Sequence, residues 1–393
     1  MAQPRRVIVI GGGIGGLAAA AALHLRGSQV TVLERSRSLA PVGAAISLAP
    51  NALRALDVLG IGDEIRDLAA WSGDGGLRTP RGRWLSRSSA AAAAERFGGP
   101  LVLLHRATLV NSLAALLPPG TVRTAAETAL VDPGDAHRPA RVRTPDGELE
   151  ADLVVAADGI HSAVRRALFP DHPGAAYSGF TTWRLVIPLP GTQFASHETW
   201  GRGRIWGTHP LKDGRVYAYA AALAPAGERA PDERAELVRR YGDWHDPIPA
   251  VLAAARPEDV LRHDVHHIAE PLPAFHRGRV ALLGDAAHAM PPTLGQGGNQ
   301  AIEDAVVLAH HHTDLAAYSA ARLPRTTAIA RQAVRIGRLN LTANRGLMVV
   351  RDTAIAALSL AGPALFLRGF DGIADWRPPL PPYASVVSGA GKR

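Results

Sequence analysis

The stretch from Val7 to Glu34 constrains the fold of this chain more than any other. It consists of an apolar strand over residues 7–10, a glycine-rich turn over residues 11–16, an alanine-rich helix, and a second strand that ends in the acid Glu34. Strand, turn, helix, strand and acid together are typical of the first unit of a doubly wound sheet that binds a nucleotide. The stretch therefore predicts an α/β fold with a Rossmann-like lobe.

The turn carries the G-x-G-x-x-G spacing at Gly11, Gly13 and Gly16. The first glycine allows the tight turn, the second lets a pyrophosphate approach the backbone, and the third lets the helix pack closely on the strand. Phosphates would then lie on free N–H groups at the positive end of the helix. Glu34 is placed to accept hydrogen bonds from a ribose hydroxyl, and its charge disfavours a 2′-phosphate. The predicted nucleotide is FAD or NAD rather than NADP.

Composition excludes several classes of protein. The chain has 393 residues and no cysteine, which rules out disulfides, thiolate metal sites, cysteine nucleophiles and cysteinyl-flavin links.

The net charge of the chain is +8, but of 43 basic residues only Lys212 and Lys392 are lysines, and the arginines are scattered rather than clustered. We therefore expect no nucleic-acid partner. The first strand begins at once, which leaves no room for a signal peptide, so a cytoplasmic enzyme is expected.

Hydrophobic texture divides the chain into four parts. Residues 1–170 are expected to form the first part of the nucleotide-binding lobe, and residues 276–345 the second part. Residues 171–275 have strand-like alternation and four of the seven tryptophans, which predicts an inserted antiparallel sheet for substrate binding. Residues 346–393 are expected to form a C-terminal helix and a proline-rich tail, with charges that interrupt the apolar stretch and so argue against stable membrane insertion.

Two further segments repeat the arrangement of a buried strand followed by an aspartate. Asp158 follows the apolar run over residues 153–157, and Asp285 follows the run over residues 279–284. Because ligands gather at the carboxyl ends of parallel strands, both aspartates should face the same crevice as Gly11. After Asp285 comes a loop with Pro292, Gly295, Gly297, Gly298 and Asn299, whose N–H groups can hold negative charge.

These three motifs, in this order, resemble the single-component FAD-dependent monooxygenases of the p-hydroxybenzoate hydroxylase fold. Residues 177–184 and Asp304 look most like the branch of salicylate hydroxylase, urate hydroxylase and zeaxanthin epoxidase. The resemblance covers roughly residues 6–345. It implies non-covalent FAD, transient NADH or NADPH, and O2, with oxygen transferred to an aromatic or polycyclic small molecule through a flavin C4a-hydroperoxide.

The resemblance also implies roles for individual residues. Asp285 would bind the sugar chain of FAD, and Asp158 would serve both FAD and the nicotinamide donor. Pro292 and the loop from Gly295 to Asn299 would border the isoalloxazine. The ADP half of FAD would be held by the residues of the first unit and its neighbours: Gly11, Gly13, Gly16, Glu34, Arg35 and Arg106.

Candidates for substrate contact come from position in the inserted sheet. Arg184 is a candidate anchor for an acidic substrate, and His209 or Tyr217 a candidate hydrogen-bonding partner. A salt bridge for Arg184 and core packing for Tyr217 are the alternatives. We expect a structural role for His288. No metal site is expected at residues 310–312, because consecutive helical histidines point in different directions.

Other functions stay open. An epoxidase or an O2-independent FAD-dependent oxidoreductase would carry the same cofactor motifs, and a flavin-binding module without turnover is the alternative from another class. A flavin-dependent halogenase is disfavoured, because that chemistry relies on a lysine in the flavin lobe and no lysine occurs before Lys212. The sequence leaves open whether the chain is a monomer or a homodimer.

Overall fold

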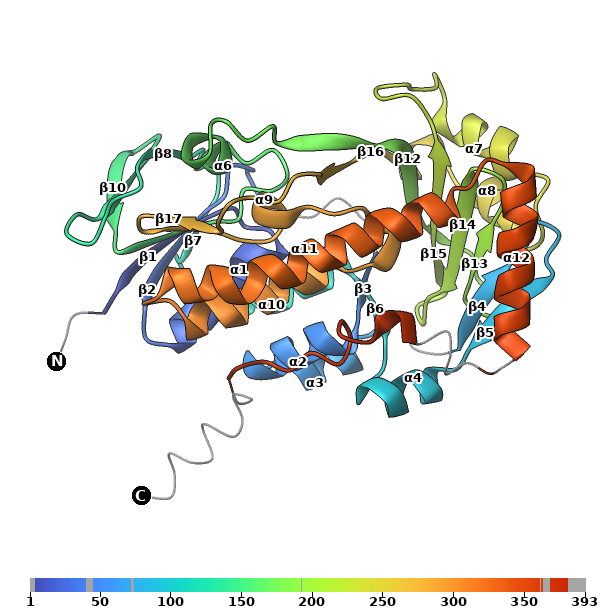
Figure 1. Cartoon of the computed structure of the whole chain (residues 1–393), viewed down its shortest axis with the longest axis horizontal. Coiled ribbons are helices and arrows are strands. Elements are labelled where there is room, and N and C mark those ends of the chain that lie inside the picture. The colour runs from blue at the N-terminus through green and yellow to red at the C-terminus, as the bar shows by residue number, and fades with distance from the viewer. Residues whose placement is uncertain are drawn as a thin grey trace.

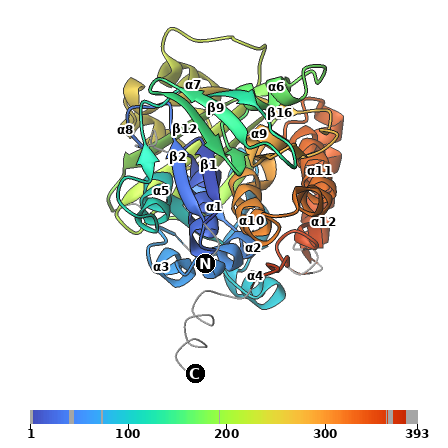
Figure 2. The same ribbon diagram turned by 90° about the vertical axis from the view of Figure 1, so that its left-hand side faces the viewer.

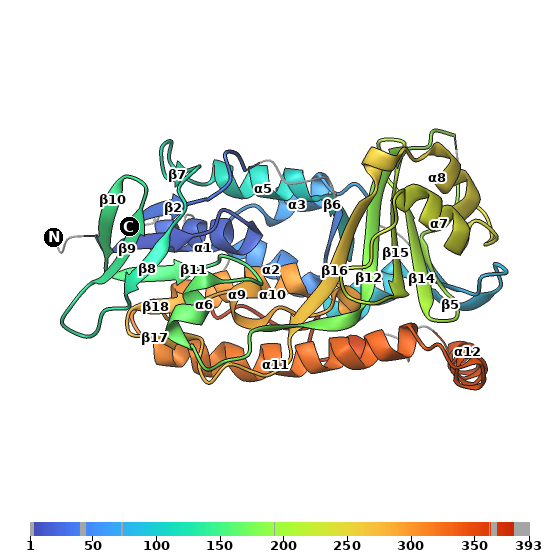
Figure 3. The same cartoon turned by 90° about the horizontal axis from the view of Figure 1, so that it is seen from above.

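The computed structural model describes residues 4–39, 45–71, 74–191, 193–360, 362 and 368–380. Two lobes lie side by side along the long axis (Figures 1 and 3). A nucleotide lobe holds the parallel sheet, and a sheet lobe holds the antiparallel one. This arrangement, with helices at the C-terminal end, confirms the α/β fold with an inserted antiparallel sheet.

The sheet of the nucleotide lobe has six strands, and all but one of its pairings are parallel. β1 lies between β2 and β11, so Glu34 and Asp158 follow strands that flank the glycine turn. In spatial order the strands are β17 (His276–Arg277), β18 (Val280–Leu282), β11 (Leu153–Ala156), β1 (Arg6–Ile10), β2 (Gln29–Leu33) and β7 (Val122–Arg123).

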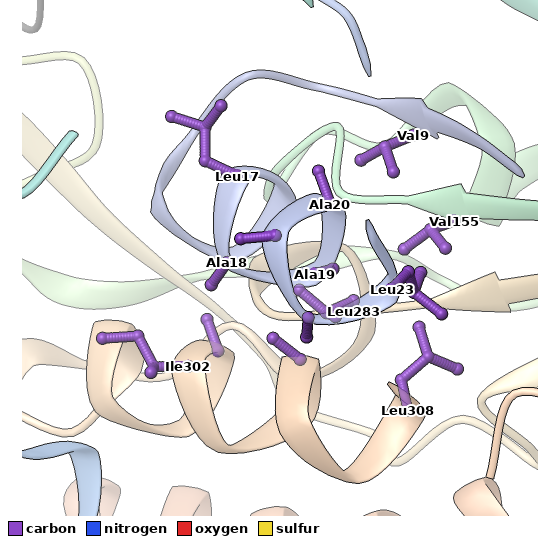
Figure 4. Packing of buried hydrophobic residues seen from close by; sticks show 14 of the residues in the cluster. Val9, Leu17, Ala18, Ala19, Ala20, Leu23, Val155, Leu283, Ile302 and Leu308 are labelled. Atoms are coloured by element: carbon purple, nitrogen blue, oxygen red, sulfur yellow. The ribbon is translucent and has the colours of Figure 1, made fainter. Parts of the chain in front are cut away.

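Two helices that begin at glycine-rich loops pack against each other below this sheet. α1 (Ile14–Leu25) and α10 (Gly297–His310) lie side by side (Figure 2), and Figure 4 shows small and branched side chains filling the space between them. Alanines on α1 let the two helices approach closely. A Cβ at Gly15 would lie 3.1 Å from the Cβ of Ala301, so the contact begins at the first turn of α1. Both helix N-termini are thereby held at the same edge of the sheet.

The sheet lobe contains seven strands. Two of them come from the first 170 residues, and they extend the sheet because β4 pairs with β13 in parallel. The spatial order is β16 (Leu261–Ile268), β12 (Ala175–Pro188), β15 (Arg215–Leu223), β14 (Arg204–Pro210), β13 (His197–Trp200), β4 (Gly75–Arg78) and β5 (Trp84–Ser88).

The two faces of this sheet have different partners. Trp183, Leu185, Trp206 and alternate residues of β15 pack under α7 (Glu233–Tyr241) and α8 (Ile248–Ala254). The opposite face, which includes Tyr217 and Val186, packs against β3 (Ala45–Leu48) and β6 (Val102–His105) of the nucleotide lobe. The second face therefore borders the space between the lobes.

The remaining elements complete the two lobes. α11 (Leu315–Asn340) runs from the nucleotide lobe to the sheet lobe, and α12 (Arg345–Leu360) lies along β5 (Figure 1). The others are α2 (Pro50–Val58), α3 (Gly62–Asp67), α4 (Ala90–Phe97), α5 (Arg106–Ala115), β8 (Ala129–Asp132), β9 (Ala140–Thr144), β10 (Gly147–Ala151), α6 (Ala163–Leu168), η1 (Pro257–Asp259), α9 (Asp285–His288), η2 (Pro292–Leu294) and η3 (Arg368–Phe370).

The tail is partly ordered. Residues 376–380 form neither helix nor strand, but Arg54 of α2 donates to the carbonyl oxygens of Ala374 and Trp376. The last thirteen residues lie outside the described part of the chain. Among the described residues, no helix combines the length and hydropathy needed to cross a membrane.

Candidate active site

The glycine turn after β1 shows why each motif glycine is required. Gly11 has φ +108°, a conformation that L side chains rarely adopt, and a Cβ there would overlap the carbonyl oxygen of Ala157. A Cβ at Gly16 would overlap the carbonyl oxygen of Gly11, so only glycine lets α1 approach the strand. A Cβ at Gly13 would meet nothing within 4 Å. The turn is thus closed on the protein side and open over Gly13.

Glu34 closes one side of this turn. Its Oε2 accepts from the N–H of Gly12 at 2.6 Å, and its Oε1 accepts from the N–H of Ser36 at 2.8 Å. Partial burial opposes ionisation, but these two hydrogen bonds and the charge of Arg35 outweigh it and lower the pKa of Glu34. Arg35 itself is exposed. A carboxylate therefore stays ionised at the tip of β2, where a ribose would lie.

Asp158 stands on the other side of the turn, at the end of β11. Its Oδ2 accepts from the N–H of Val164 at 3.2 Å, at the start of α6. Its Oδ1 is buried and has no hydrogen-bond partner among the described residues. Because buried polar atoms are normally paired, this oxygen is suited to a ligand hydroxyl or amide.

Asp285 begins α9 and is exposed, whereas the residues that hold its turn are buried. Gly284 has φ +60°, and its N–H donates to Oδ2 of Asp304 at 3.0 Å. The same Oδ2 pairs with Nε2 of His288 at 2.5 Å, and Oδ1 pairs with Nε of Arg322 at 2.6 Å. The geometry is consistent with the structural role expected of His288, and it leaves the Asp285 carboxylate free to contact a ligand.

The loop from Pro292 to Asn299 lies against β3. The side-chain amide of Asn299 donates to the carbonyl oxygens of Ser47 and Gly295, and its Oδ1 accepts from Ala49. These bonds use both amide hydrogens, so a hydrogen bond donated by Asn299 to a ligand would have to come from its backbone N–H. Pro292 and Gly295 are exposed, while Gly297 and Gly298 are partly buried at the start of α10.

Arg106 faces both lobes from the start of α5. Solvent reaches part of the side chain, but protein atoms surround most of the guanidinium. The resulting desolvation lowers the pKa of Arg106. The charge of Arg184 on β12 lowers that pKa further, while Asp285 opposes the shift. Arg106 therefore lies in the electrostatic field of residues from both sides of the space between the lobes.

The three residues predicted to contact substrate share one face of the antiparallel sheet. Tyr217 pairs with His209 of β14 and with Val186 of β12, and Val186 is two residues from Arg184. Since side chains two residues apart on a strand lie on the same face, the structure brings all three together. The rings of His209 and Tyr217 are stacked with centroids 5.9 Å apart.

Each of the three retains an unused polar atom. The Nε of Arg184 is buried without a partner, and among the described residues nothing bonds Nε2 of His209 or the Tyr217 hydroxyl. Burial, with a contribution from His197, lowers the pKa of His209 to about 4, so its ring is neutral at pH 7. Burial raises the pKa of Tyr217 to about 12, so its hydroxyl remains a donor.

Tyr219 and Glu198 were not predicted, although they belong to the same face. The Tyr219 hydroxyl donates to Oε1 of Glu198 at 2.7 Å, and Trp200 donates to the other carboxylate oxygen. The alternation that pointed to Tyr217 also indicates Tyr219, but nothing local predicts Glu198, which meets Tyr219 only because β13 lies two strands from β15. Unlike the first three residues, this pair is already satisfied within the protein.

Comparison with known proteins shows which family this chain resembles. The family model described as "FAD binding domain" matches residues 5–333. The chain belongs to this FAD-binding domain family. It is 35% identical to the aurachin C monooxygenase/isomerase of Stigmatella aurantiaca, over 90% of this chain and 94% of that protein. It is also 35% identical to the FAD-dependent urate hydroxylase of Klebsiella oxytoca, over 77% of this chain and 80% of that protein.

Solved structures of similar proteins confirm the architecture. HpxO of Klebsiella pneumoniae, solved with FAD and uric acid, has a TM-score of 0.85 at 29% identity and covers 94% of this chain and 96% of its own. A salicylate hydroxylase substrate complex, at 22% identity, shares the fold with a TM-score of 0.71 and covers 96% of this chain and 99% of its own. The chain is an FAD-dependent oxidoreductase with the class A flavin monooxygenase fold.

The residues at the edge of the parallel sheet fit FAD. The opening over Gly13 leaves room for a pyrophosphate, and the unpartnered Oδ1 of Asp158 offers an acceptor beside it. No group of three or more His, Asp or Glu side chains that could hold a metal ion occurs in the described part of the chain.

Proposed function

We propose that this chain uses NADH or NADPH and O2 to hydroxylate an aromatic or heterocyclic small molecule. Its relatives carry names such as urate hydroxylase and 3-amino-4-hydroxybenzoate 2-monooxygenase, which supports this substrate class. We also propose that it works in the cytoplasm, as a monomer or homodimer.

FAD would be held by the first unit and the two aspartates. Gly11, Gly13 and Gly16 would shape the turn for the pyrophosphate, and Arg35 and Arg106 would contribute positive charge. Glu34 would accept from the adenosine ribose, Asp285 would contact the sugar chain, and the N–H groups of residues 295–299 would face the flavin ring. Bound FAD would supply hydride acceptance from the donor and activation of O2.

The observation that carries the proposal is the group of unused polar atoms on the sheet face. Arg184, His209 and Tyr217 present a guanidinium nitrogen, an imidazole nitrogen and a hydroxyl beside aromatic and aliphatic side chains such as Trp71, Leu103 and Val186. Such a wall can take a flat ring, and a few fixed polar groups can orient it. Arg184 would attract an acidic or carbonyl oxygen, while Tyr217 would donate and neutral His209 would donate or accept according to its tautomer.

The position of this wall favours chemistry at the flavin. β3 lies between this wall and the loop over residues 292–299. Its Ile46 lies against the loop at Gly298, and its Ala45 packs in the cluster of Tyr217 and Val186. A substrate on the wall would therefore lie next to the loop that borders the flavin ring. Trp71, whose ring lies 5.9 Å from that of His209, would help to exclude water.

The proposal is tested by measuring NADH and NADPH oxidation in air by the FAD-loaded protein, with a panel of phenols, salicylates, purines and quinolones. A compound that accelerates oxidation and gains one oxygen atom supports the proposal. Peroxide without product for every compound, or turnover that needs no O2, would contradict it and favour a reductase. FAD binding without stimulated oxidation would favour a non-catalytic module.

A matched pair of variants tests the sheet face that carries Arg184, His209 and Tyr217, which we call the substrate wall. Tyr217→Phe removes a hydroxyl without a protein partner, so we expect KM for the substrate to rise about tenfold with little change in Tm. Tyr241→Phe removes a hydroxyl that donates to Ala221 at 2.9 Å under α7. It should lower stability by about 1 kcal/mol and leave KM unchanged. Equal effects of both variants on KM would contradict the assignment of Tyr217.

A further inference from the structure

A pocket lies away from the substrate wall, between α11, the end of β16 and α9. Its volume is about 320 Å³, and among the residues that line it are Arg331, Arg335, Arg338, His267, His288 and Phe275. No residue of the proposed substrate wall and no motif glycine lines it. The pocket is therefore separate from the substrate wall and from the glycine turn, and it shares His288 with the site described above.

The chemistry of this pocket is that of an anion site with an apolar floor. Arg331, Arg335 and Arg338 lie four and three residues apart, so they share one face of α11 and span about 10 Å along the helix. Leu272, Phe275 and Val334 supply apolar surface, and among the residues that the structure describes no acidic side chain lines the pocket.

The pocket arginines differ from others on the same helix. Arg322 and Arg325 of α11 are paired with Glu303 at 2.6 and 2.8 Å. Within the described residues, the three pocket arginines make no ion pair and no side-chain hydrogen bond. Three exposed cations without carboxylate partners on one helix face favour a ligand that carries several negative charges.

The histidines add further polar groups. Nδ1 of His288 is buried and has no partner among the described residues, while its Nε2 is held by Asp304. The side chain of His288 is only 4% exposed. His267 is fixed by Ser178, whose Oγ lies 2.8 Å from its Nδ1. The pocket thus combines surface charge with a buried polar atom that the protein leaves unsatisfied.

We propose that this pocket binds the phosphate-bearing adenosine half of the NADH or NADPH donor, an inference that rests on the proposed function. The volume lies at the low end for small-molecule sites, which suits half a dinucleotide rather than a whole one. The apolar floor can take the adenine ring, and the arginines can take its phosphates. The chain has no second strand-bound G-x-G-x-x-G, so a donor needs a different kind of site.

The pocket also adjoins the loop assigned to the flavin ring. Thr293 of that loop donates to the carbonyl oxygen of Ala333 at 2.5 Å, between Arg331 and Arg335 on α11. On the other side, Arg165 of α6 donates to the carbonyl oxygen of Ala286 on α9 at 2.9 Å, which connects the pocket wall to the region of Asp158. A donor anchored here would have its nicotinamide half beside the flavin loop.

The test is calorimetric titration of the FAD-loaded protein with NAD⁺ and NADP⁺, which bind without turnover. The double variant Arg331→Glu/Arg335→Glu should weaken binding of the preferred nucleotide by about tenfold or more, with unchanged FAD content. Arg345→Glu, an exposed arginine outside the pocket, should leave binding within about twofold. Should the double variant lose FAD, the neutral change Arg335→Gln is expected to weaken binding in the same direction.

Competition by 2′,5′-ADP or 5′-ADP, but not by nicotinamide mononucleotide, supports the adenosine half as the occupant. Unchanged affinity in the pocket variants, no binding of either nucleotide to the wild type, or equal competition by inorganic phosphate would overturn the proposal. Because binding is measured without oxygenation, nucleotide binding in a protein that hydroxylates nothing would separate this pocket from the proposed reaction.

Discussion

At the scale of single residues, two glycines of one motif have different reasons to be glycine. Gly13 has φ −75°, and open space surrounds the position of a Cβ, so Gly13→Ala should leave the stability of the FAD-free protein almost unchanged. The new methyl group would occupy the pyrophosphate space, and the Kd for FAD should rise about tenfold or more.

Gly16→Ala should behave in the opposite way. Its Cβ would overlap the backbone of Gly11, which cannot move aside as a side chain could, so we expect a loss of about 1–3 kcal/mol or more in the FAD-free protein. Denaturant unfolding and flavin fluorescence titration of the two variants check both statements. Equal loss of stability in the two variants would show that the turn does not have this geometry.

Two buried histidines predict how stability depends on pH. Burial lowers the pKa of His209 and of His197 to about 4, so both fold in the neutral form. Below about pH 6.5 the unfolded chain takes up protons that the folded chain does not, and stability should fall by up to about 1.4 kcal/mol per pH unit for each histidine. Urea unfolding at pH 7.5 and 5.5 should show this loss, and His209→Gln should reduce it. An unchanged pH dependence in His209→Gln would contradict a buried neutral His209.

Sequence reasoning works best for residues whose role is local. The roles of Gly11 and Gly16 follow from the spacing of a strand and a helix, and their positions here agree with that reasoning. Glu303 and Arg322 gave no such signal, since they meet only when α10 and α11 pack together. Alternation indicated the face of Tyr217, but whether its hydroxyl is free depends on strands that are distant in sequence.

At the scale of secondary-structure elements, a buried charge network joins α10 to α11. Arg322 is 1% exposed and pairs with Glu303 and Asp304, which are fully buried. The pKa of Asp304 is lowered to about 2 because His288 and Arg322 more than offset its burial. Arg322→Met would leave these carboxylates undercompensated and should cost about 3–5 kcal/mol.

The matched control is Arg239→Met, which removes an exposed partner of Glu236 on α7. This change should cost less than about 1 kcal/mol, because exposed ion pairs contribute little. Thermal unfolding of both variants measures the difference. A small effect of Arg322→Met would mean that the network does not hold the turn at Asp285 in place.

Which segments form helices and strands was largely predictable, but which sheet each strand joins was not. The strand and helix patterns around Val7, Asp158 and Asp285 are strong because these strands are buried on both sides. The hairpin of β4 and β5 lies within the first 170 residues, yet its place in the antiparallel sheet depends on the pairing of β4 with β13, more than 100 residues later. The expected boundaries at residues 170 and 275 stay predictions.

At the scale of the whole molecule, contacts between the lobes bring the sheet face of Arg184, His209 and Tyr217 close to the loop over residues 292–299. Nε2 of His105, at the end of β6, lies 3.2 Å from Oδ2 of Asp213 and 2.8 Å from Nη2 of Arg215. Both partners belong to the hairpin that joins β14 to β15. α11 spans both lobes along one side (Figure 3). These connections fix the wall of Arg184, His209 and Tyr217 relative to the nucleotide lobe, which no single segment of sequence could indicate.

The most direct test of the account is isotopic. A compound that stimulates NAD(P)H oxidation is converted by the FAD-loaded protein under ¹⁸O2 in ordinary water, and the mass of the product is measured. We predict that one atom of ¹⁸O enters the product, and that the label disappears when the experiment is repeated with ordinary O2 in H2¹⁸O under conditions without exchange. Product that takes its oxygen from water, or that forms without O2, would contradict the assignment of this chain as a monooxygenase.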